Sequence, residues 1–390
     1  MKEECAIVFH CNKDYVFALG TMLHNLEEHA VSFSKILVYT DFYDESVFNA
    51  FYGFSDKIEF IYYPLEEFIS EYGIDITKPK TKQYIGRYTH LCYIKFKIIQ
   101  LLARFRHVLF MDLDMYVTGN FDELFAMDCD IAWKCGVPLL TKFSKSGLDA
   151  GSIPCLKGAD RTTPAPNGGF ILVNDTMAYD EVYAFSRDFL CSYAEYFNST
   201  IDEIVFAVAA LSRNLRLKKL DPRIYNTPAQ QFTAQSKIVH FIGKETKPWS
   251  NMFFQDIFSG WVRNYRIFSE KTHCVSDKVR DSRQTELSSC RLEFTYDNGQ
   301  KYGIIYQVGP DKSIQCALTL NEEKYAFDAE SLHDLNEYSC HGVQGTGADG
   351  DALSPGKLPA EFESLYHRLR KALAGDPRQV INFKAFPAAK

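Results

Sequence analysis

The stretch Val108-Leu109-Phe110-Met111-Asp112-Leu113-Asp114 ends an apolar run with two aspartates that are separated by one residue. The apolar residues predict a buried strand, and ligand sites of open α/β sheets lie beyond the carboxyl ends of such strands. A continuing strand would point Asp112 and Asp114 to the same side, where a cation must neutralise the two carboxylates. The stretch therefore predicts a site for a hard divalent ion, Mn²⁺ or Mg²⁺.

The same triplet also has a purely structural interpretation. Asn120, Asp122 and Glu123 follow it closely, so the acidic residues could instead form a cap and turn cluster. Two aspartates separated by one residue are common in proteins. The other motifs of the chain are therefore needed to distinguish the two interpretations.

Short apolar runs alternate with helical spacings through the first half of the chain, which is typical of an α/β domain with a largely parallel sheet. The pattern predicts strands at residues 6–9, 35–40, 58–63, 108–111, 130–133, 168–173 and 237–241. It predicts helices that begin near residue 15, at 93–104, at about 179–196 and at about 202–211. Residues 141–166 are expected to form a loop long enough to have a function of its own.

The pattern changes near residue 269, so we expect a larger α/β domain at 1–268 and a smaller α+β domain at 269–390. In the second domain, a turn at 297–299 between apolar runs predicts a hairpin. Further strands are expected at 316–320 and 324–327, and a mobile Gly-rich segment at 342–356. A helix near 362–373 has a basic face, which could contact anionic lipid or simply face solvent.

The bulk composition narrows the function classes. The chain has 390 residues, of which 46% are hydrophobic, and a formal net charge of -7, so it is expected to fold fully and not to attract nucleic acid. No apolar run approaches the roughly 20 residues that span a bilayer, and no secretory signal is expected at the N-terminus. Eleven cysteines without a CxxC pair predict reduced core residues of a cytoplasmic protein, with peripheral membrane contact as the remaining route to a membrane.

Further motifs surround the triplet in a fixed order. They are Ile7-Val8-Phe9 with Asn12 and Tyr15, Tyr93-Ile94-Lys95, Asn167-Gly168-Gly169, Asp202-Glu203, and His240-Phe241-Ile242-Gly243 with Lys247-Pro248-Trp249. Together they resemble glycosyltransferase family 8, which includes glycogenin and bacterial lipopolysaccharide glycosyltransferases, over roughly residues 5–250. The resemblance implies a GT-A fold, a Rossmann-like mixed sheet flanked by helices. It also implies a retaining, Mn²⁺-dependent transfer of a hexose, glucose or galactose, from a UDP-sugar to a hydroxyl of a glycan, lipid-linked or protein acceptor.

The resemblance also implies roles for single residues. The donor would be bound by His10, Asn12 and Tyr15 at the uridine, by Lys95, Gly243 and Lys247 at the diphosphate, and by Asn167, Gly168 and Gly169 at the sugar. Asp112, Asp114 and His240 would hold the metal, with Asp112 also beside the donor. Structural alternatives exist for each: Asn12 as a helix cap, Lys95 as a solvated charge, the two glycines as a tight turn and His240 as a core histidine.

The chain departs from the family pattern at two places. Three residues instead of two separate Gly243 from Lys247, so Lys244 is the alternative diphosphate ligand, although we favour Lys247. Asp202-Glu203 replaces the usual Asp-Gln, and a carboxylate is a better nucleophile than an amide and stabilises an oxocarbenium-like charge better. We hypothesise that Glu203 does one of these while Asp202 binds a sugar or acceptor hydroxyl. Alternatively, Glu203 is a favourable acid in the first turn of a helix.

Two other functions fit these motifs less well than transfer does. A nucleotide-sugar-binding protein without turnover would have no need to keep Asp112, Asp114 and His240 together. A sugar-nucleotide nucleotidyltransferase would begin with a Gly-rich basic phosphate loop, which residues 9–20 lack.

Overall fold

The computed structural model describes residues 2–390 with the exception of 54, 145, 147, 158–162, 198–199, 244–245, 273, 280–287, 296–300, 309–313, 321–322, 330–344, 347–351, 354–383 and 388–390. The chain divides into two compact units, Met1–Asn226 with Phe268–Cys274, and Thr227–Ile267 with Val275–Lys390. The single boundary near residue 269 stays a prediction.

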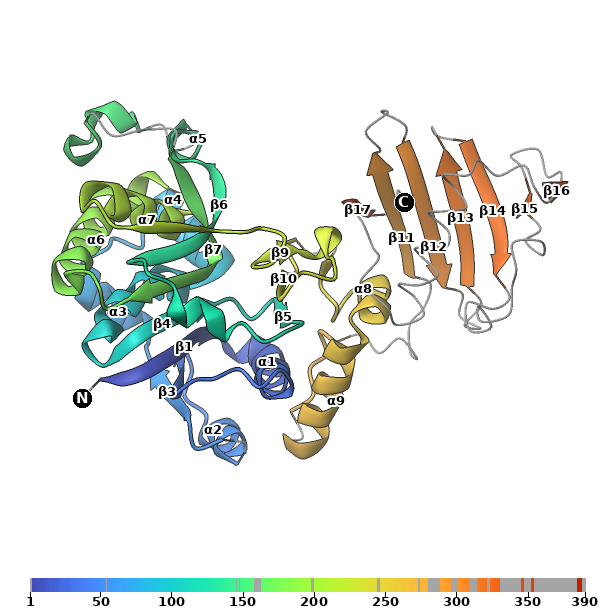
Figure 1. Ribbon diagram of the computed structural model, residues 1–390, viewed down its shortest axis with the longest axis horizontal. Helices are drawn as coiled ribbons and strands as arrows, with labels where there is room; N and C mark the ends of the chain where they lie inside the picture. The colour runs from blue at the N-terminus through green and yellow to red at the C-terminus, as the bar shows by residue number, and fades with distance from the viewer. Residues whose placement is uncertain are drawn as a thin grey trace. The chain divides into compact units, whose positions relative to one another are not determined.

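The first unit is built on a seven-stranded mixed sheet in the order β3-β2-β1-β4-β7-β6-β8 (Figure 1). Its strands are β1 (Glu3–Cys11), β2 (Lys35–Thr40), β3 (Ile58–Tyr62), β4 (Phe105–Met111), β6 (Ile131–Pro138), β7 (Pro164–Asn174) and β8 (Leu217–Leu220). β1, β2, β3 and β4 pair in parallel, whereas β7 runs antiparallel to both β4 and β6. The predicted α/β fold with a GT-A-type mixed sheet is confirmed.

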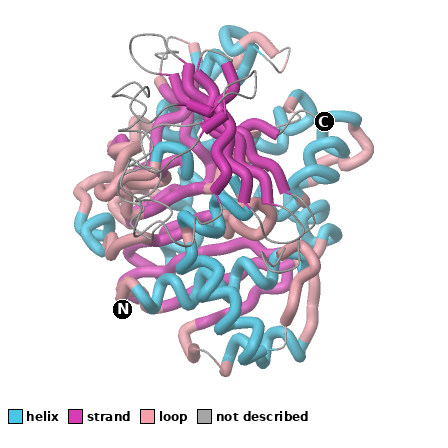
Figure 2. The backbone as a smooth tube through the Cα atoms, turned by 90° about the vertical axis from the view of Figure 1, so that its right-hand side faces the viewer, coloured by secondary structure: helices cyan, strands magenta, loops and turns pink. Residues whose placement is uncertain are grey.

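Helices flank this sheet (Figure 2). They are α1 (Val16–Glu28), α2 (Glu45–Tyr52), α3 (Leu65–Tyr72), α4 (Pro79–Tyr88), the 3₁₀ helix η2 (His90–Ala103), α5 (Leu139–Ser144), α6 (Tyr179–Tyr193) and α7 (Ile201–Ser212). The predicted helices near 15, 93–104, 179–196 and 202–211 correspond to α1, η2, α6 and α7. The predicted bounds of the loop at 141–166 are wrong, because α5 extends into it and β7 begins at Pro164, and its function stays a prediction.

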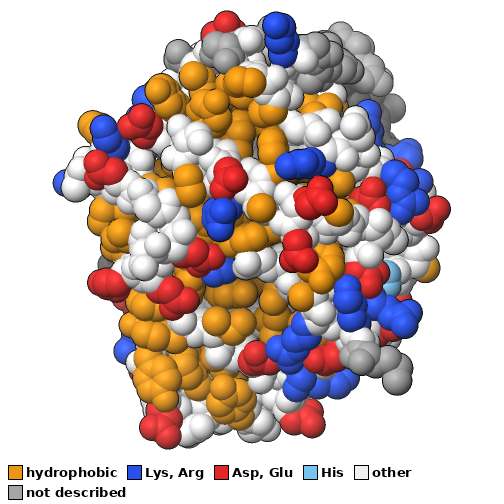
Figure 3. Space-filling view, turned by 90° about the vertical axis from the view of Figure 1, so that its left-hand side faces the viewer, with side chains coloured by type: hydrophobic (Ala, Val, Ile, Leu, Met, Phe, Trp, Pro, Cys, Tyr) orange, Lys and Arg blue, Asp and Glu red, His pale blue; other side chains and the backbone are white. Residues whose placement is uncertain are grey.

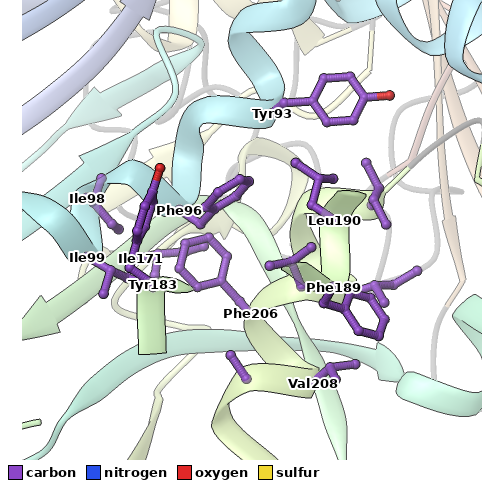
Figure 4. Packing of buried hydrophobic residues seen from close by; sticks show 14 of the residues in the cluster. Tyr93, Phe96, Ile98, Ile99, Ile171, Tyr183, Phe189, Leu190, Phe206 and Val208 are labelled. Atoms are coloured by element: carbon purple, nitrogen blue, oxygen red, sulfur yellow. The ribbon is translucent and has the colours of Figure 1, made fainter. Parts of the chain in front are cut away.

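The central core lies between α7 and the sheet. Every residue from Ile201 to Ala210 is buried, so α7 is apolar on all sides and only its first turn contains acids. Figure 4 shows how side chains from α7, α6, η2 and β7 meet in this core, including Phe206, Val208, Phe189, Leu190, Phe96 and Ile171. A helix enclosed in this way holds its first turn in a fixed place at the edge of the sheet.

The second unit contains β9 (Thr227–Pro228), β10 (Ile238–His240), α8 (Met252–Ile257) and most of α9 (Ser259–Thr272). It also contains an antiparallel sheet in the order β16-β15-β14-β13-β12-β11-β17. Its strands are β11 (Ser288–Thr295), β12 (Lys301–Val308), β13 (Ile314–Leu320), β14 (Glu323–Ala329), β15 (Gly345–Thr346), β16 (Ala352–Leu353) and β17 (Lys384–Pro387). The predicted hairpin is confirmed by the pairing of β11 with β12. The turn at 297–299 and the helix near 362–373 lie outside the described residues, as does most of 342–356.

Two composition-based expectations can be compared with the described residues. Cysteines 5, 11, 92, 129, 135, 155, 191 and 274 are free thiols, but Cys191 is exposed and so is not the core residue that we expected. No helix among the described residues is long and apolar enough to cross a membrane. Acidic and basic side chains are interspersed on the face of the molecule in Figure 3.

Candidate active site

The two aspartates of the opening stretch occupy a turn rather than a strand. β4 ends at Met111 and β5 (Met115–Val117) begins after Asp114, so our assumption of a continuing strand is wrong. Leu113 is nevertheless buried while both aspartates are partly exposed. The backbone N–H of Asp112 donates to the carbonyl of Gly169 at 2.8 Å, which fixes the start of the turn on β7.

Lys95 joins two carboxylates at this edge of the sheet. Its ammonium group lies 3.2 Å from Asp112 Oδ1 and 3.3 Å from Asp202 Oδ2, and it donates to the carbonyl of Gly168 at 3.2 Å. It also lies 5.0 Å from the centre of the Phe110 ring. Burial alone would lower the pKa of Lys95, but the two carboxylates outweigh burial and hold that pKa well above its usual value. Lys95 is therefore a buried ion-pair partner, and the interpretation as a solvated charge is wrong.

The first turn of α7 brings Asp202 and Glu203 to the same place. Both side chains are buried, and the Tyr84 hydroxyl donates to Asp202 Oδ1 at 3.2 Å. Glu203 Oε1 accepts a hydrogen bond from the Gly168 N–H at 2.9 Å, and Glu203 Oε2 forms an ion pair with Lys142. Burial and the neighbouring Asp202 raise the pKa of Glu203. Placement in the first helical turn agrees with the structural interpretation of Glu203 and leaves its catalytic role a prediction.

Asn167, Gly168 and Gly169 lie within β7 and not in a turn before it. β4 pairs with β7 as far as Met111 opposite Phe170, so these three residues continue beyond the end of β4. Asn167 Oδ1 accepts from Asn226 Nδ2 at 2.8 Å, which orients the Asn167 amide. The backbone of Gly168 therefore reaches Glu203 through its N–H and Lys95 through its carbonyl.

The end of β1 and the residue that follows it contain two polar atoms without partners among the described residues. His10 Nδ1 and Asn12 Oδ1 are buried and accept or donate no hydrogen bond among the described residues. Asn12 stands at the cap position of a 3₁₀ turn but its side chain makes no cap bond, so the capping interpretation is wrong. His10 stacks on Phe110 with 5.4 Å between ring centres. Burial, reinforced by Lys95, lowers the pKa of His10 to about 4, so the ring is neutral at neutral pH.

Three predicted site residues belong to the second unit. His240 is the last residue of β10 and is buried. Gly243 has a φ of 90°, in the left-handed region that favours glycine. The Lys247 ammonium donates to the carbonyl of Phe241 and lies 5.6 Å from the centre of the Trp249 ring. Lys244 lies outside the described residues.

The sequence did not point to three residues that contact the predicted site. Tyr84 and Asn226 hydrogen-bond Asp202 and Asn167, and Lys142 forms the ion pair with Glu203. Pro79 is typical of the first residue of a helix, so the helix that contains Tyr84 could have been predicted from it. Nothing in the local sequence indicates the partners of Asn226 or Lys142, because 59 and 61 residues separate them from those partners.

The fold, with an acid-containing turn beyond β4, agrees with a sequence comparison. Residues 6–137 match the model of the family described as Glycosyl transferase family 8, and the predicted resemblance is confirmed over those residues. The match supports assignment of the chain to the glycosyltransferases as a class. No protein with a curated description matches the chain.

Solved glycosyltransferase structures are similar to the chain at low identity. The bifunctional glycosyltransferase WbbM is 13% identical with a TM-score of 0.48, and the match covers 70% of this chain and 52% of WbbM, about half its length. Galactosyltransferase LgtC, solved with donor and acceptor sugar analogues, is 15% identical with a TM-score of 0.44 and coverages of 70% and 98%. Mouse xyloside xylosyltransferase 1 is 14% identical with a TM-score of 0.42 and coverages of 64% and 99%. At TM-scores below 0.5, these likenesses carry no weight for function.

Proposed function

We propose that the chain is a retaining glycosyltransferase that transfers a hexose from a UDP-sugar to a hydroxyl of a glycan, lipid-linked or protein acceptor, with Mn²⁺ or alternatively Mg²⁺. One observation carries the proposal: the buried Lys95 links Asp112, beyond β4, to Asp202, in the first turn of α7. The two acids and a fixed positive charge thus lie at one edge of the sheet, and we propose that Asp112 binds the metal and Asp202 binds the sugar. This is the arrangement that a diphosphate-linked sugar needs.

The donor set suits a divalent cation. The family resemblance implies that Asp112, Asp114 and His240 hold the ion, and carboxylates with an imidazole are ligands that a divalent cation accepts. Carboxylate oxygens with one imidazole nitrogen fit Mn²⁺, and carboxylates with water fit Mg²⁺. When bound, such an ion would act as a Lewis acid on the leaving diphosphate. Asp112 would share its charge between that ion and Lys95.

The nucleotide of the donor could hydrogen-bond to two buried polar atoms that have no partner among the described residues. Buried polar atoms are nearly always hydrogen-bonded, so His10 Nδ1 and Asn12 Oδ1 call for a partner. We propose that the uridine of the donor supplies it, with the partly exposed Tyr15 beside them. A neutral His10 ring offers one donor and one acceptor, which suits the edge of a base.

The reacting sugar would lie against β7 and α7. We propose that the Asn167 amide and the Asp202 carboxylate hydrogen-bond the sugar hydroxyls, and that Gly168 and Gly169, which have no side chains, let the sugar approach β7 closely. Lys95 adds positive charge where the diphosphate charge develops, and we propose the same role for Lys247 with Gly243.

Glu203 would act at the anomeric carbon. As a nucleophile, its carboxylate oxygen would form a bond to that carbon while the bond to the UDP oxygen breaks and its electron pair leaves with UDP. The acceptor oxygen would then form the new glycosidic bond while the bond to the Glu203 carboxylate breaks, and the acceptor proton would pass to a phosphate oxygen of UDP. As a stabiliser, the same carboxylate would face an oxocarbenium-like charge without a covalent bond. Glu203→Gln with most of the wild-type turnover would rule out the nucleophile.

The proposal is tested by UDP release from a panel of UDP-sugars with Mn²⁺, with and without EDTA. We expect release with at least one donor, loss of release in EDTA, and recovery on adding Mn²⁺. NMR of the product should show the anomeric configuration of the donor. Binding of UDP-sugars without release would favour a binding protein, and metal-independent release would contradict the metal site.

A further inference from the structure

We infer that Lys142 of α5 is a positioning residue of this site, which holds Glu203 as an oriented carboxylate beside Gly168. The inference rests on the proposed function, because it gives Lys142 a role in the transfer and assigns α5 to the active site. Nothing in the sequence patterns or in the family resemblance selects Lys142.

The contacts of Glu203 account for both of its oxygens. Oε2 forms the ion pair with the Lys142 ammonium, and Oε1 accepts the Gly168 N–H at 2.9 Å. The two side chains of the ion pair are only 14% and 10% exposed, so solvent screens their attraction weakly. Two partners on opposite oxygens fix the plane of the carboxylate, which neither partner alone would do.

The position of Lys142 is itself fixed by α5. Leu139 and Phe143 are buried on either side of it in the sequence, and the Phe143 ring packs against Phe197 with 5.6 Å between ring centres. The Leu139 N–H also donates to the carbonyl of Thr163 at 2.9 Å, next to the start of β7. This short helix is therefore anchored by its apolar residues, and its lysine is directed at Glu203.

The two acids in the first turn of α7 are paired with different lysines, and Lys95 also pairs with Asp112. Asp202 is neutralised by Lys95 from η2, and it also accepts from Tyr84 of α4. Glu203 is neutralised by Lys142 from α5, and the N–H of Gly168 in β7 faces its other oxygen. Glu203 is this chain's departure from the family pattern, and Lys142 balances the charge that the departure adds.

Removal of Lys142 should therefore change the protonation of Glu203 and not only its orientation. Burial and Asp202 both favour the neutral acid, and Lys142 is the cation that opposes them at Glu203. Without Lys142, Glu203 takes up its proton at a higher pH. The transfer needs the ionised carboxylate of Glu203, so activity should be lost at a higher pH than in the wild type as the pH falls.

The experiment is a double-mutant cycle in the full chain. It compares Lys142→Met, Lys142→Arg, Glu203→Gln and the double variant Lys142→Met/Glu203→Gln. For each variant, kcat and the donor KM are measured by UDP release with Mn²⁺ from about pH 5 to about pH 9. Lys80→Met is the matched control. Lys80 donates hydrogen bonds to the backbone carbonyls of Ser146, close to α5 in the sequence, and of Tyr196, and neither of these two acceptors is a carboxylate.

We expect Lys142→Met to lower kcat about tenfold or more with a smaller change in KM, and to move the acid limb of the profile to higher pH. Lys142→Arg should restore most of kcat, and Lys80→Met should keep the wild-type acid limb. In the Glu203→Gln background, Lys142→Met should change kcat less than about threefold.

Three results would overturn the inference. One is a wild-type acid limb in Lys142→Met, and another is an equal loss from Lys142→Met in both backgrounds. If Lys142→Met does not fold, the double variant decides: recovery of folding supports the charge pair, and continued loss overturns it. A wild-type chain that releases no UDP from any donor would contradict the proposed function itself, and the inference with it.

Discussion

Gly168 lies so close to Asp202 that a Cβ atom built on the glycine would lie 2.6 Å from Asp202 Oδ2. The Asp202 carboxylate could not move away from such an atom without losing contacts, because it also contacts the Lys95 ammonium and the Tyr84 hydroxyl. Glu203 is also in tight contact, with its Cγ at 3.1 Å from the same position. The absence of a side chain at residue 168 is thus what allows the two acids of α7 to lie against β7.

We therefore expect Gly168→Ala to lower UDP release about tenfold or more, because Asp202 and Glu203 must both shift. Gly86→Ala is the matched control: Gly86 is exposed in α4, and no atom lies within 4 Å of its built Cβ. The control should keep its activity and gain about 0.5–1 kcal/mol in the free energy of unfolding. Wild-type turnover in Gly168→Ala would show that the placement of the two acids does not matter.

Lys95→Met should destabilise the fold as well as the reaction. It leaves Asp112 and Asp202 near each other without their shared cation, and breaking a buried ion pair in this way costs about 3–5 kcal/mol. Urea unfolding measures the loss. The exposed ion pair of Lys78 with Glu195 offers a comparison, and Lys78→Met should cost less than about 1 kcal/mol. Equal costs for the two variants would contradict a buried bridge at Lys95.

The sequence predicted the sheet better than its helices, for a physical reason. Parallel strands that are covered on both faces consist of nearly continuous apolar runs, as residues 6–9 and 108–111 do. α4 contains three lysine or arginine residues and only two buried side chains, so its periodicity is weak. α2 and α3 have eight residues each, which is too short for a helical spacing to repeat clearly.

The residues of the candidate site could likewise be predicted only in part. Asp112 and Lys95 were identified because family motifs name them, and the structure brings them together. The geometric argument for the aspartates failed, because a turn replaces the strand at 112–114 and still leaves Leu113 as the buried residue of the three. The pair of Lys142 with Glu203 is a tertiary contact, and neither residue type nor spacing encodes such a contact in a single sequence.

A pH dependence of stability is expected from Glu71 of α3. Its carboxylate accepts from the Lys97 ammonium at 2.6 Å and from the hydroxyls of Tyr63 at 2.6 Å and Tyr183 at 2.8 Å. Burial raises the pKa of Glu71, but these bonds outweigh burial, and the pKa lies below its usual value. A carboxyl group with a lowered pKa stabilises the folded state above its unfolded pKa, and that stability is lost as the pH falls through the folded pKa.

The free energy of unfolding should therefore fall below about pH 4 in the wild type and fall less steeply in Glu71→Gln. Urea unfolding at a series of pH values measures both slopes. Glu66→Gln, at an exposed position of the same helix, should keep the wild-type slope. Identical slopes for the wild type and Glu71→Gln would show that this hydrogen-bonded cluster does not contribute to acid stability.

Metal binding can be measured apart from turnover. We expect calorimetric titration in the presence of UDP to show a Mn²⁺ site, and Asp114→Asn to weaken it about tenfold or more, because a charged oxygen ligand is replaced by a neutral one. Asp128→Asn changes an exposed aspartate that pairs with Arg216, and it should leave the affinity unchanged. Equal affinities for the wild type and Asp114→Asn would remove Asp114 from the metal site.

The end of α9 packs within the first unit against Gly20 of α1. A Cβ atom built on Gly20 of α1 would lie 2.2 Å from Phe268 Cδ2, and the Phe268 ring is fully buried, 5.2 Å from the ring of Phe51. Because a rigid buried ring cannot move aside, Gly20→Ala should cost about 1–3 kcal/mol in the free energy of unfolding. Phe268→Leu vacates part of this space, so Gly20→Ala should cost clearly less in that background. Thermal and urea unfolding of the two single variants and the double variant give the coupling between the sites. If Gly20→Ala were equally costly in both backgrounds, its effect would come from α1 itself and not from contact with Phe268.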